Sequence, residues 1–359
     1  MARLPSSIWP KLLTAGLAGI FAGIIARWIG MPLPWMLGPM IGCGAIALAG
    51  VPVLAPTGLR QVVIPVIGVM LGSGFHPELL DHIGSWAGTL LLLPAFLAVA
   101  AAASYAFYRF VGGYDPVNAF FCAAPGGLNE MIILGGEAGG DETRIALAHS
   151  LRVFLVISII ATSYALALDI RAARGPDTWV AVTDLSLLDT AILLATGGLG
   201  VLAGKRLHLP APMLFGPMIL SAAAHMAEIV TVPPPSLLVT AAQITIGTIL
   251  GCRFAGVSPA SMGRDLLLGL GATIVLLCVT IVFAAFLGPL TGTPLAQGVL
   301  AFSPGGLTEM SLLALSMDQD IAYVSTMHVI RIVLVLFGMP LIFRAIGGRL
   351  IDGSRKSKD

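Results

Sequence analysis

Glutamate, histidine and arginine recur in this sequence as a set, at a constant separation of 179 residues. The repeated pairs are Glu130 with Glu309, His149 with His328, and Arg152 with Arg331. Glutamate and histidine side chains can carry protons, and an arginine side chain can hold an anionic group. Each histidine precedes its arginine by three residues, so a helix would turn both side chains toward the same side. The set therefore predicts a site that binds protons or an anionic solute.

A polar, helix-breaking motif precedes each of the two glutamates. The sequence PGGLNEM occupies 125–131, and PGGLTEM occupies 304–310. Proline removes a helical hydrogen bond and Gly-Gly adds flexibility, so we expect each motif to interrupt a helix and expose backbone N–H and C=O groups. The substrate- or ion-binding residues that we predict are Pro125, Gly126, Gly127, Asn129, Glu130, His149 and Arg152 in the first copy, and Pro304, Gly305, Gly306, Thr308, Glu309, His328 and Arg331 in the second.

The same charged residues also fit a structural role. Each glutamate of the set could pair with one of the two arginines, which would hold the two copies together without binding a solute. Asp141 and Asp320 recur at the ends of apolar segments, where helix capping is the more common role of an aspartate.

The elements that carry these residues are apolar enough to lie in a membrane. Of 359 residues, 57% are hydrophobic and 10% are charged, against roughly 25% charged in an ordinary soluble domain. A net charge of +1 argues against a nucleic-acid partner, because nucleic-acid binders concentrate basic residues. The four cysteines lack CxxC spacing, and we expect no cofactor and no metal site.

Six apolar segments can be read in each half of the chain. They cover 12–26, 35–49, 59–74, 86–108, 116–135 and 144–168, then 186–203, 213–229, 236–251, 265–287, 295–316 and 321–343. A first membrane repeat would occupy 1–170, a polar linker 171–183, a second membrane repeat 184–347, and a basic cytoplasmic tail 348–359. Glycines at four-residue spacing, Gly68 with Gly72 and Gly247 with Gly251, predict helices that approach closely.

Positive charge in the loops predicts that the two halves cross the membrane in opposite directions. The loop near Arg109 is basic and its counterpart at 288–294 is not, whereas the loop at 76–85 lacks basic residues and its counterpart carries Arg253 and Arg264. An inverted repeat needs an odd number of crossings per half, so we predict that the two PGG segments are broken or re-entrant. This places 13 basic residues inside and three outside, compared with 11 and five for twelve full crossings. The predicted fold is an all-α membrane protein with two inverted repeats, each of about five transmembrane helices plus one broken PGG segment.

The PGGLxEM pair, the His-x-x-Arg pair and a further duplicated motif at 32–40 and 210–218 together resemble the AbrB family of bacterial membrane proteins. Members have also been labelled ammonia monooxygenases and linked with regulation of gene expression, and the family is unrelated to the small soluble DNA-binding AbrB regulators. The resemblance covers nearly the whole chain and implies a multi-pass protein of the bacterial inner membrane. As a fold, the 5+5 plan is similar to the cation/proton antiporter and anion transporter superfamily.

We expect a secondary transporter of a small solute, anionic if the arginines contact it, that works by alternating access at a midplane site between the repeats. Its partners would be the lipid bilayer, the solute and H⁺ or Na⁺, with a homo-oligomer as a further option and both termini cytoplasmic. The alternative is a membrane-embedded regulator that acts indirectly on gene expression. A membrane metallo-enzyme is the least favoured reading because the six histidines are scattered, so we expect no enzymatic activity.

Overall fold

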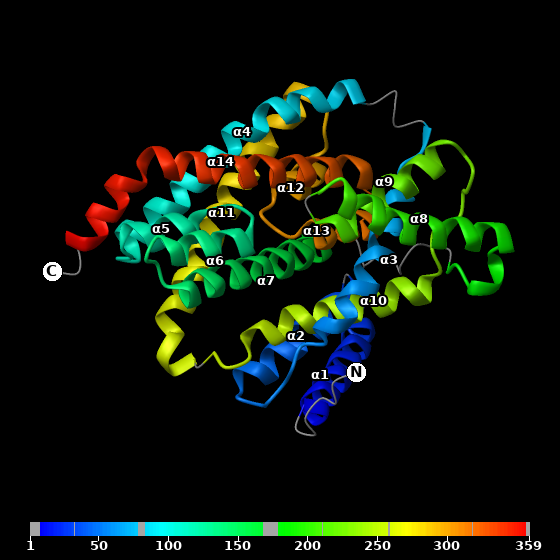
Figure 1. Cartoon of the computed structure of the whole chain (residues 1–359), viewed down its shortest axis with the longest axis horizontal. Helices are drawn as coiled ribbons and strands as arrows, with labels where there is room; N and C mark the ends of the chain where they lie inside the picture. Colours follow the sequence, from blue (N-terminus) through cyan, green and yellow to red (C-terminus); the bar gives the residue numbers. More distant parts are fainter. Residues whose placement is uncertain are drawn as a thin grey trace. The chain divides into compact units, whose positions relative to one another are not determined.

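The structure is a computed structural model that describes residues 8–31, 33–77, 83–167, 179–209, 211–257, 259–317 and 319–356. Throughout these residues the regular elements are helices (Figure 1). The first half contains α1 (Ile8–Trp28), α2 (Pro34–Leu48), α3 (Arg60–Gly72), α4 (Ile83–Ala106), α5 (Pro116–Ala123), α6 (Leu128–Glu137) and α7 (Glu142–Ala167). The second contains α8 (Leu187–Arg206), α9 (Pro212–Met226), α10 (Ser236–Gly251), α11 (Pro259–Thr291), α12 (Leu295–Phe302), α13 (Leu307–Ser316) and α14 (Ile321–Lys356).

The order of helices follows the sequence repeat. Each of the twelve predicted segments is helical in the structure, and the two PGG segments are each divided into two short helices, as predicted. The polar linker falls mostly outside the described residues, as do Pro32 and Pro210 of the second duplicated motif. Helix α14 runs on to Lys356, through most of the segment that we assigned to the tail.

Seven of the helices are long and apolar enough to cross a membrane, which makes this a multi-pass membrane protein. These spans are Ile8–Trp28, Trp86–Val111, Glu142–Tyr164, Leu187–Arg206, Ser236–Phe254, Gly263–Thr291 and Ile321–Ala345. Four other apolar helices are shorter: Pro34–Leu48, Thr57–Gly72, Pro212–Met226 and Leu307–Ser316. The all-α membrane fold is therefore confirmed, while the prediction of ten crossings goes beyond the seven spans that length supports.

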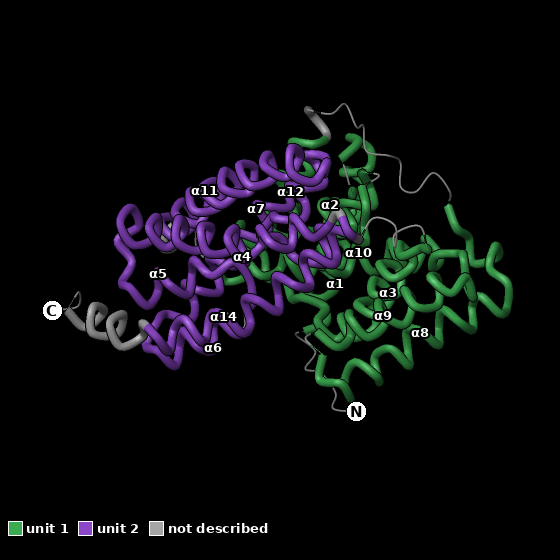
Figure 2. Tube along the Cα trace, turned by 90° about the horizontal axis from the view of Figure 1, so that it is seen from above, with its two compact units in different colours: residues 1–82, 158–258, 311–322 green, residues 83–157, 259–310, 323–359 purple. Residues whose placement is uncertain are grey.

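The chain folds into two compact units, and each unit draws on both halves of the sequence (Figure 2). Unit 1 comprises residues 1–82, 158–258 and 311–322, and so contains α1 to α3 and α8 to α10. Unit 2 comprises residues 83–157, 259–310 and 323–359. It contains both PGG motifs and both His-x-x-Arg pairs, so every residue of the predicted site belongs to unit 2.

Unit 1 is held together by close contacts at the predicted glycines. A Cβ atom at Gly68 would lie 2.6 Å from the carbonyl oxygen of Leu214 on α9, and one at Gly251 would lie 2.6 Å from that of Met40 on α2. Only glycine allows backbones to come this near. Helix α3 of the first half thus packs on α9 of the second, and α10 of the second half packs on α2 of the first.

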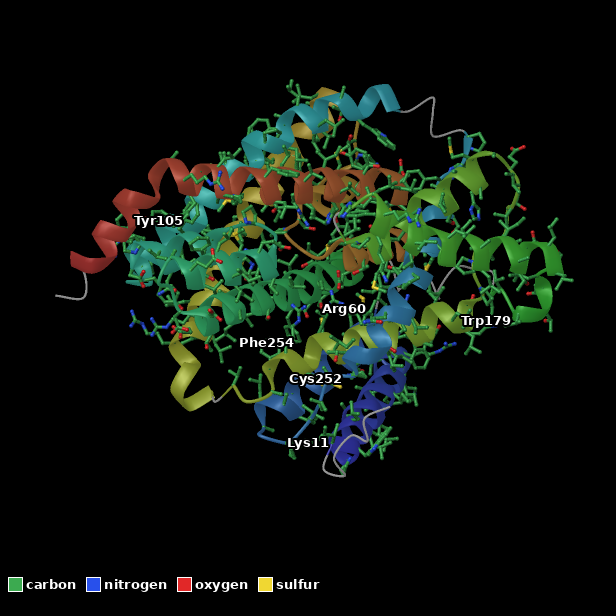
Figure 3. All side chains as sticks on the ribbon, in the orientation of Figure 1. Lys11, Arg60, Tyr105, Trp179, Cys252 and Phe254 are labelled. Carbon is green, nitrogen blue, oxygen red and sulfur yellow. The ribbon has the colours of Figure 1, made fainter. Side chains whose placement is uncertain are left out.

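The starts of α2 and α9 share an unusual backbone conformation. Leu33 and Ala211, at equivalent positions of the two halves, have φ angles of 44° and 47° in the left-handed region that non-glycine residues rarely adopt. A proline follows each of them as the first helical residue, where its missing N–H costs nothing. Helix α10 ends in a short turn whose buried residues, Cys252 and Phe254, are marked in Figure 3.

In unit 2, the equivalent helices α4 and α11 run antiparallel. Gly88, near the start of α4, lies against the side chain of Thr291 at the end of α11. At the other end, Arg264 near the start of α11 donates a hydrogen bond over 2.7 Å to the carbonyl of Gly112, beyond the end of α4. Contacts at both ends fix the relative direction of this helix pair.

Candidate functional site

The first helix break follows from its local sequence. Asp115 caps α5 by accepting hydrogen bonds from the backbone N–H groups of Val117 and Asn118, both over 3.1 Å, and Pro116 is the first helical residue. The helix stops at Ala123 because a residue that precedes proline is driven out of the helical region. Ala124, just before Pro125, accordingly has a ψ angle of 125°. Gly127, with φ of 65°, then starts α6 from a left-handed conformation that suits glycine.

A histidine and an arginine on α7 bind the carbonyl end of α5. His149 hydrogen-bonds through Nε2 to the carbonyl oxygen of Phe121 over 2.8 Å. Arg152 donates from Nη1 to the carbonyl oxygen of Ala124 over 2.7 Å, and its Nη2 contacts Nδ1 of His149 over 2.8 Å. Both side chains are buried, with exposed fractions of 1% and 5%. The two residues therefore act together on the same interrupted helix.

The second break repeats this arrangement on α12 and α14. His328 hydrogen-bonds through Nε2 to the carbonyl oxygen of Leu300 over 2.9 Å, and its Nδ1 lies 3.0 Å from Nη2 of Arg331. Arg331 donates to the carbonyl oxygens of Ser303 and, over 2.7 Å, Gly305. In both halves the histidine and the arginine each form a hydrogen bond with a backbone carbonyl 28 residues earlier in the chain. The His-x-x-Arg repeat is thus a duplicated contact with a helix break.

This contact solves an electrostatic problem that a helix break creates in a membrane. The last four carbonyls of a helix have no partner within it, and the end carries roughly −0.5 of an elementary charge. Lipid offers no hydrogen-bond donor, so such groups must find donors inside the protein. The cationic arginines and the imidazole N–H groups supply donors, and the arginines also supply positive charge.

The alternative structural role, in which each glutamate pairs with an arginine, is not supported by the ion pairs among the described residues. The ion pairs found in the described part of the chain join Arg144 to Asp141 and to Asp265, and none joins Glu130 or Glu309 to an arginine. Each glutamate lies instead in the first turn of α6 or α13. A helix N-terminus attracts negative charge, and the arginines are occupied by carbonyls at the opposite side of each break.

The two glutamates differ in their surroundings. Glu309 is buried, with 6% of its surface exposed, and its carboxylate accepts a hydrogen bond over 2.7 Å from the hydroxyl of Thr308. Glu130 is exposed. Asn129 occupies the position equivalent to Thr308, and its side chain lies outside the described part of the structure. The two halves of the predicted site are therefore alike at the arginines and different at the carboxylates.

Both breaks lie against neighbouring turns of α14. Arg331 on this helix binds carbonyls of the second break, and the side chain of Val335, one turn later, lies beside Gly126 in the first break. Both PGG motifs thus pack against the same helix, α14.

Among the other predicted residues, Pro125, Pro304 and Gly305 are buried within the breaks. Asp141 caps α7, accepting hydrogen bonds from the N–H groups of Thr143 and Arg144 over 2.9 and 3.2 Å, which confirms its predicted role. Asp320 directly precedes α14. No cluster of three or more His, Cys, Asp or Glu side chains placed to hold a metal ion occurs among the residues that the structure describes.

Sequence reasoning missed the backbone carbonyls that the arginines bind, because a carbonyl has no sequence signal of its own. It also missed a polar connection beneath the first break: the backbone N–H of Asp141 donates to Asn118 over 2.7 Å, and Asn118 in turn donates to Asp115. The Asp-Pro pair at 115–116 is a recognisable helix start and could have located α5.

The sequence profile of the AbrB family, described as "Transition state regulatory protein AbrB", matches residues 35–347. The chain belongs to the AbrB family. This confirms the resemblance that the duplicated motifs indicated.

Two curated proteins align along nearly the full length of this AbrB-family chain. The first, from Bacillus subtilis (strain 168), is called "Uncharacterized protein YhjN"; it is 28% identical, and the alignment covers 94% of this chain and 92% of the relative. The second, from Escherichia coli (strain K12), is called "Putative regulator AbrB"; it is 24% identical, with 96% and 97% covered. No solved structure matched the chain.

Proposed function

We propose that this AbrB-family membrane protein is a secondary transporter, which moves a small solute across the bacterial inner membrane by alternating access. The observation that carries the proposal is the pair of helix breaks in unit 2, each held at its carbonyl end by a buried His–Arg pair. Interrupted helices at repeat-related positions are where secondary transporters bind solutes and coupling ions. A purely structural helix would not need two buried breaks with compensating cations.

An inverted repeat is part of this proposal. Equivalent helices of an inverted repeat cross the membrane in opposite directions, and the antiparallel course of α4 and α11 supports that relationship. With the loop charges it supports cytoplasmic N- and C-termini and about five crossings per half. The division into two compact units, each built from both halves, also suits a mechanism in which one body moves against another.

The glutamates are the proposed sites of coupling to H⁺ or Na⁺. Glu309 is buried at the start of α13, where a carboxylate that gains and loses a cation would change the local charge by a full unit. Glu130, its exposed equivalent, is the better placed of the two to meet an arriving ion or solute. In this scheme the histidines orient the arginines and take no part in proton transfer.

A regulatory function is the second candidate, because the family description and the Escherichia coli relative both carry the word "regulatory" or "regulator". Under the transporter proposal, any effect on gene expression follows from what is transported, and the chain has no enzymatic activity. A strain that produces Glu309→Gln protein separates these functions. Normal expression of dependent genes without flux would favour direct regulation.

Flux through reconstituted protein tests the proposal. A thermal-shift screen of small metabolites would first identify a solute that stabilises the purified protein. Uptake of that solute into proteoliposomes is then expected to fall by at least about tenfold, the equivalent of 1.4 kcal/mol, in Glu130→Gln and in Glu309→Gln. Glu137→Gln, at the exposed far end of α6, is the matched control and should transport normally. Wild-type flux in both test variants would refute the site.

A further inference from the structure

The two halves differ at one pair of equivalent contacts in unit 2. Arg144 on α7 pairs with Asp265 on α11, with 3.4 Å between Nε and Oδ2. The residues 179 positions away from them are Tyr323 on α14 and Trp86 on α4, whose rings meet edge to face with centroids 5.7 Å apart. A partly exposed ion pair thus occupies the position at which the other helix pair has a buried aromatic contact.

Asp265 also contacts the loop between α4 and α5. Its Oδ1 accepts a hydrogen bond over 2.8 Å from the hydroxyl of Tyr114, just before α5. The guanidinium of Arg144 lies over the ring of Tyr114, 5.5 Å from the ring centroid. Each of the three side chains therefore contacts the other two. Tyr114 is 5% exposed and the side chain of Asp265 is 15% exposed, so water screens these contacts only in part.

These three residues lie where the first broken segment begins and ends. A Cβ atom at Gly140, beyond the end of α6, would lie 3.1 Å from Oδ1 of Asn118 near the start of α5. The backbone N–H of Asp141 donates to the same oxygen over 2.7 Å, and the carboxylate of Asp141 lies 3.6 Å from Nε of Arg144. Helices α5 and α6 therefore form a re-entrant hairpin, both ends of which meet beside Arg144.

Helix α7 connects this contact to the helix break itself. Arg144 and Arg152 lie on α7 eight residues apart, which is about 12 Å along the helix. Arg152 binds the carbonyl of Ala124 in the break, while Arg144 reaches across to α11. Loss of the contacts to Asp265 would therefore free the start of α7, together with the hairpin, from α11. Every residue of α5 is buried, so such a movement would bring water to the hairpin.

We propose that Arg144, Tyr114 and Asp265 form a latch, which closes the first helix break toward the cytoplasm and opens during transport. This inference rests on the proposed transport function and adds a part of its mechanism. The loop charges place this end of unit 2 on the cytoplasmic side. An ion pair between partly exposed residues is weak and re-forms readily, which suits a contact that opens in every cycle. The buried rings of Trp86 and Tyr323 suit a permanent contact.

The labelling rate of a native thiol measures opening of the latch. Cys122 lies on α5 and is 1% exposed, so a charged methanethiosulfonate reagent reaches it only when the hairpin opens. The parent protein keeps Cys122 and has serine at the other three cysteines. In inside-out vesicles, Asp265→Asn should raise the labelling rate roughly three- to tenfold, because the amide still accepts from Tyr114 but loses the charge. High salt should raise the rate of the parent and leave that of Asp265→Asn unchanged.

Two controls separate the latch from a general loss of stability. Glu137→Gln removes an exposed charge at the end of α6 that forms no ion pair among the described residues, and its rate should equal that of the parent. A protein that keeps only Cys43, buried in unit 1, reports global unfolding, and Asp265→Asn should not change its labelling. Unchanged labelling of Cys122 in Asp265→Asn would overturn the latch. A rise at Cys43 as large as that at Cys122, or a parent rate that salt does not change, would do the same.

Failure of the latch and failure of the transport proposal give different results. Solute uptake that depends on the two glutamates, with unchanged labelling of Cys122 in Asp265→Asn, would keep the transporter and remove the latch. Faster, salt-dependent labelling of Cys122 without uptake of any solute into proteoliposomes would keep the opening at this end of unit 2 and remove the transporter. If Asp265→Asn does not fold, the salt dependence of the parent still decides whether an ionic contact controls the opening.

Discussion

Arg152 donates a hydrogen bond from Nη2 to Nδ1 of His149, over 2.8 Å. Because arginine has no acceptor, this Nδ1 carries no hydrogen, and the ring must hold its proton on Nε2, which donates to the carbonyl of Phe121. His328 has the same two partners in the second half, Arg331 and the carbonyl of Leu300. Each histidine is therefore a neutral imidazole in the Nε2–H form, and a second proton would break its bond to arginine.

The histidine contacts predict a ranking of substitutions. Glutamine can accept from the arginine and donate to the helix carbonyl, so His149→Gln and His328→Gln should remain folded. Leucine leaves one donor and one acceptor unpaired in the interior, and His149→Leu should lose roughly 1–3 kcal/mol for each. Melting temperatures in detergent should decrease from wild type to glutamine to leucine. Equal stability of the leucine and glutamine variants would contradict the hydrogen-bond assignment.

Close helix packing in unit 1 predicts that added methyl groups are costly. At Gly68 and Gly251 a Cβ atom would lie 2.6 Å from a backbone carbonyl oxygen, which only a shift of the helix can relieve. Gly68→Ala and Gly251→Ala should each destabilise the protein by about 1–3 kcal/mol. Gly198→Ala on α8, where nothing lies within 4 Å, is the control and should be neutral or stabilising. Denaturation in a graded detergent series measures the stability of the three variants relative to wild type.

The direction of α11 predicts which loops share a side of the membrane. Residue 112 lies beside Arg264 at the start of α11, whereas residue 290 lies at the end of the same helix. Reporter fusions at 112 and 290 should therefore report opposite sides, with 112 cytoplasmic according to the loop charges. Reporters on the same side would refute both the antiparallel course of α4 and α11 and the inverted repeat.

The buried Tyr114 predicts a loss of stability at high pH. Burial, together with a hydrogen bond of 2.8 Å to Asp265, raises the pKa of this phenol well above its usual value near 10. The unfolded chain then loses the phenol proton before the folded protein does, so the stabilising effect is complete below pH 10 and declines as pH rises above it. Wild-type melting temperature should fall more steeply than that of Tyr114→Phe between pH 9 and about pH 11. Parallel curves would contradict this.

Local rules were enough to locate the helices and the breaks. Apolar length marked the segments. Proline followed by two glycines marked where 116–135 and 295–316 divide, because the residue before proline is biased away from the helical region and the glycines add conformational freedom. The partners of the charged residues were not predictable in the same way. Glutamate and arginine attract each other in any sequence. Only the fold shows that Arg152 and Arg331 donate hydrogen bonds to backbone carbonyls at helix ends and form no ion pair with the glutamates.

Assignment of the two halves as domains depended on the repeat, and the repeat does not specify which elements pack together. The glycine spacing predicted close contacts without naming partners. The structure pairs Gly68 with Leu214 and Gly251 with Met40, so each contact joins one half to the other. Which helices pack together, when they lie far apart in the sequence, depends on the surfaces of all the helices. Local sequence patterns do not describe those surfaces.

The reciprocal packing of α3 on α9 and of α10 on α2 resembles the exchange of helices in a domain-swapped dimer. Neither half can close unit 1 alone, because its glycine face would be left without the backbone that it fits. Two separately synthesised halves would therefore have to fold around each other, and each would expose its glycine face until the other half packed against it.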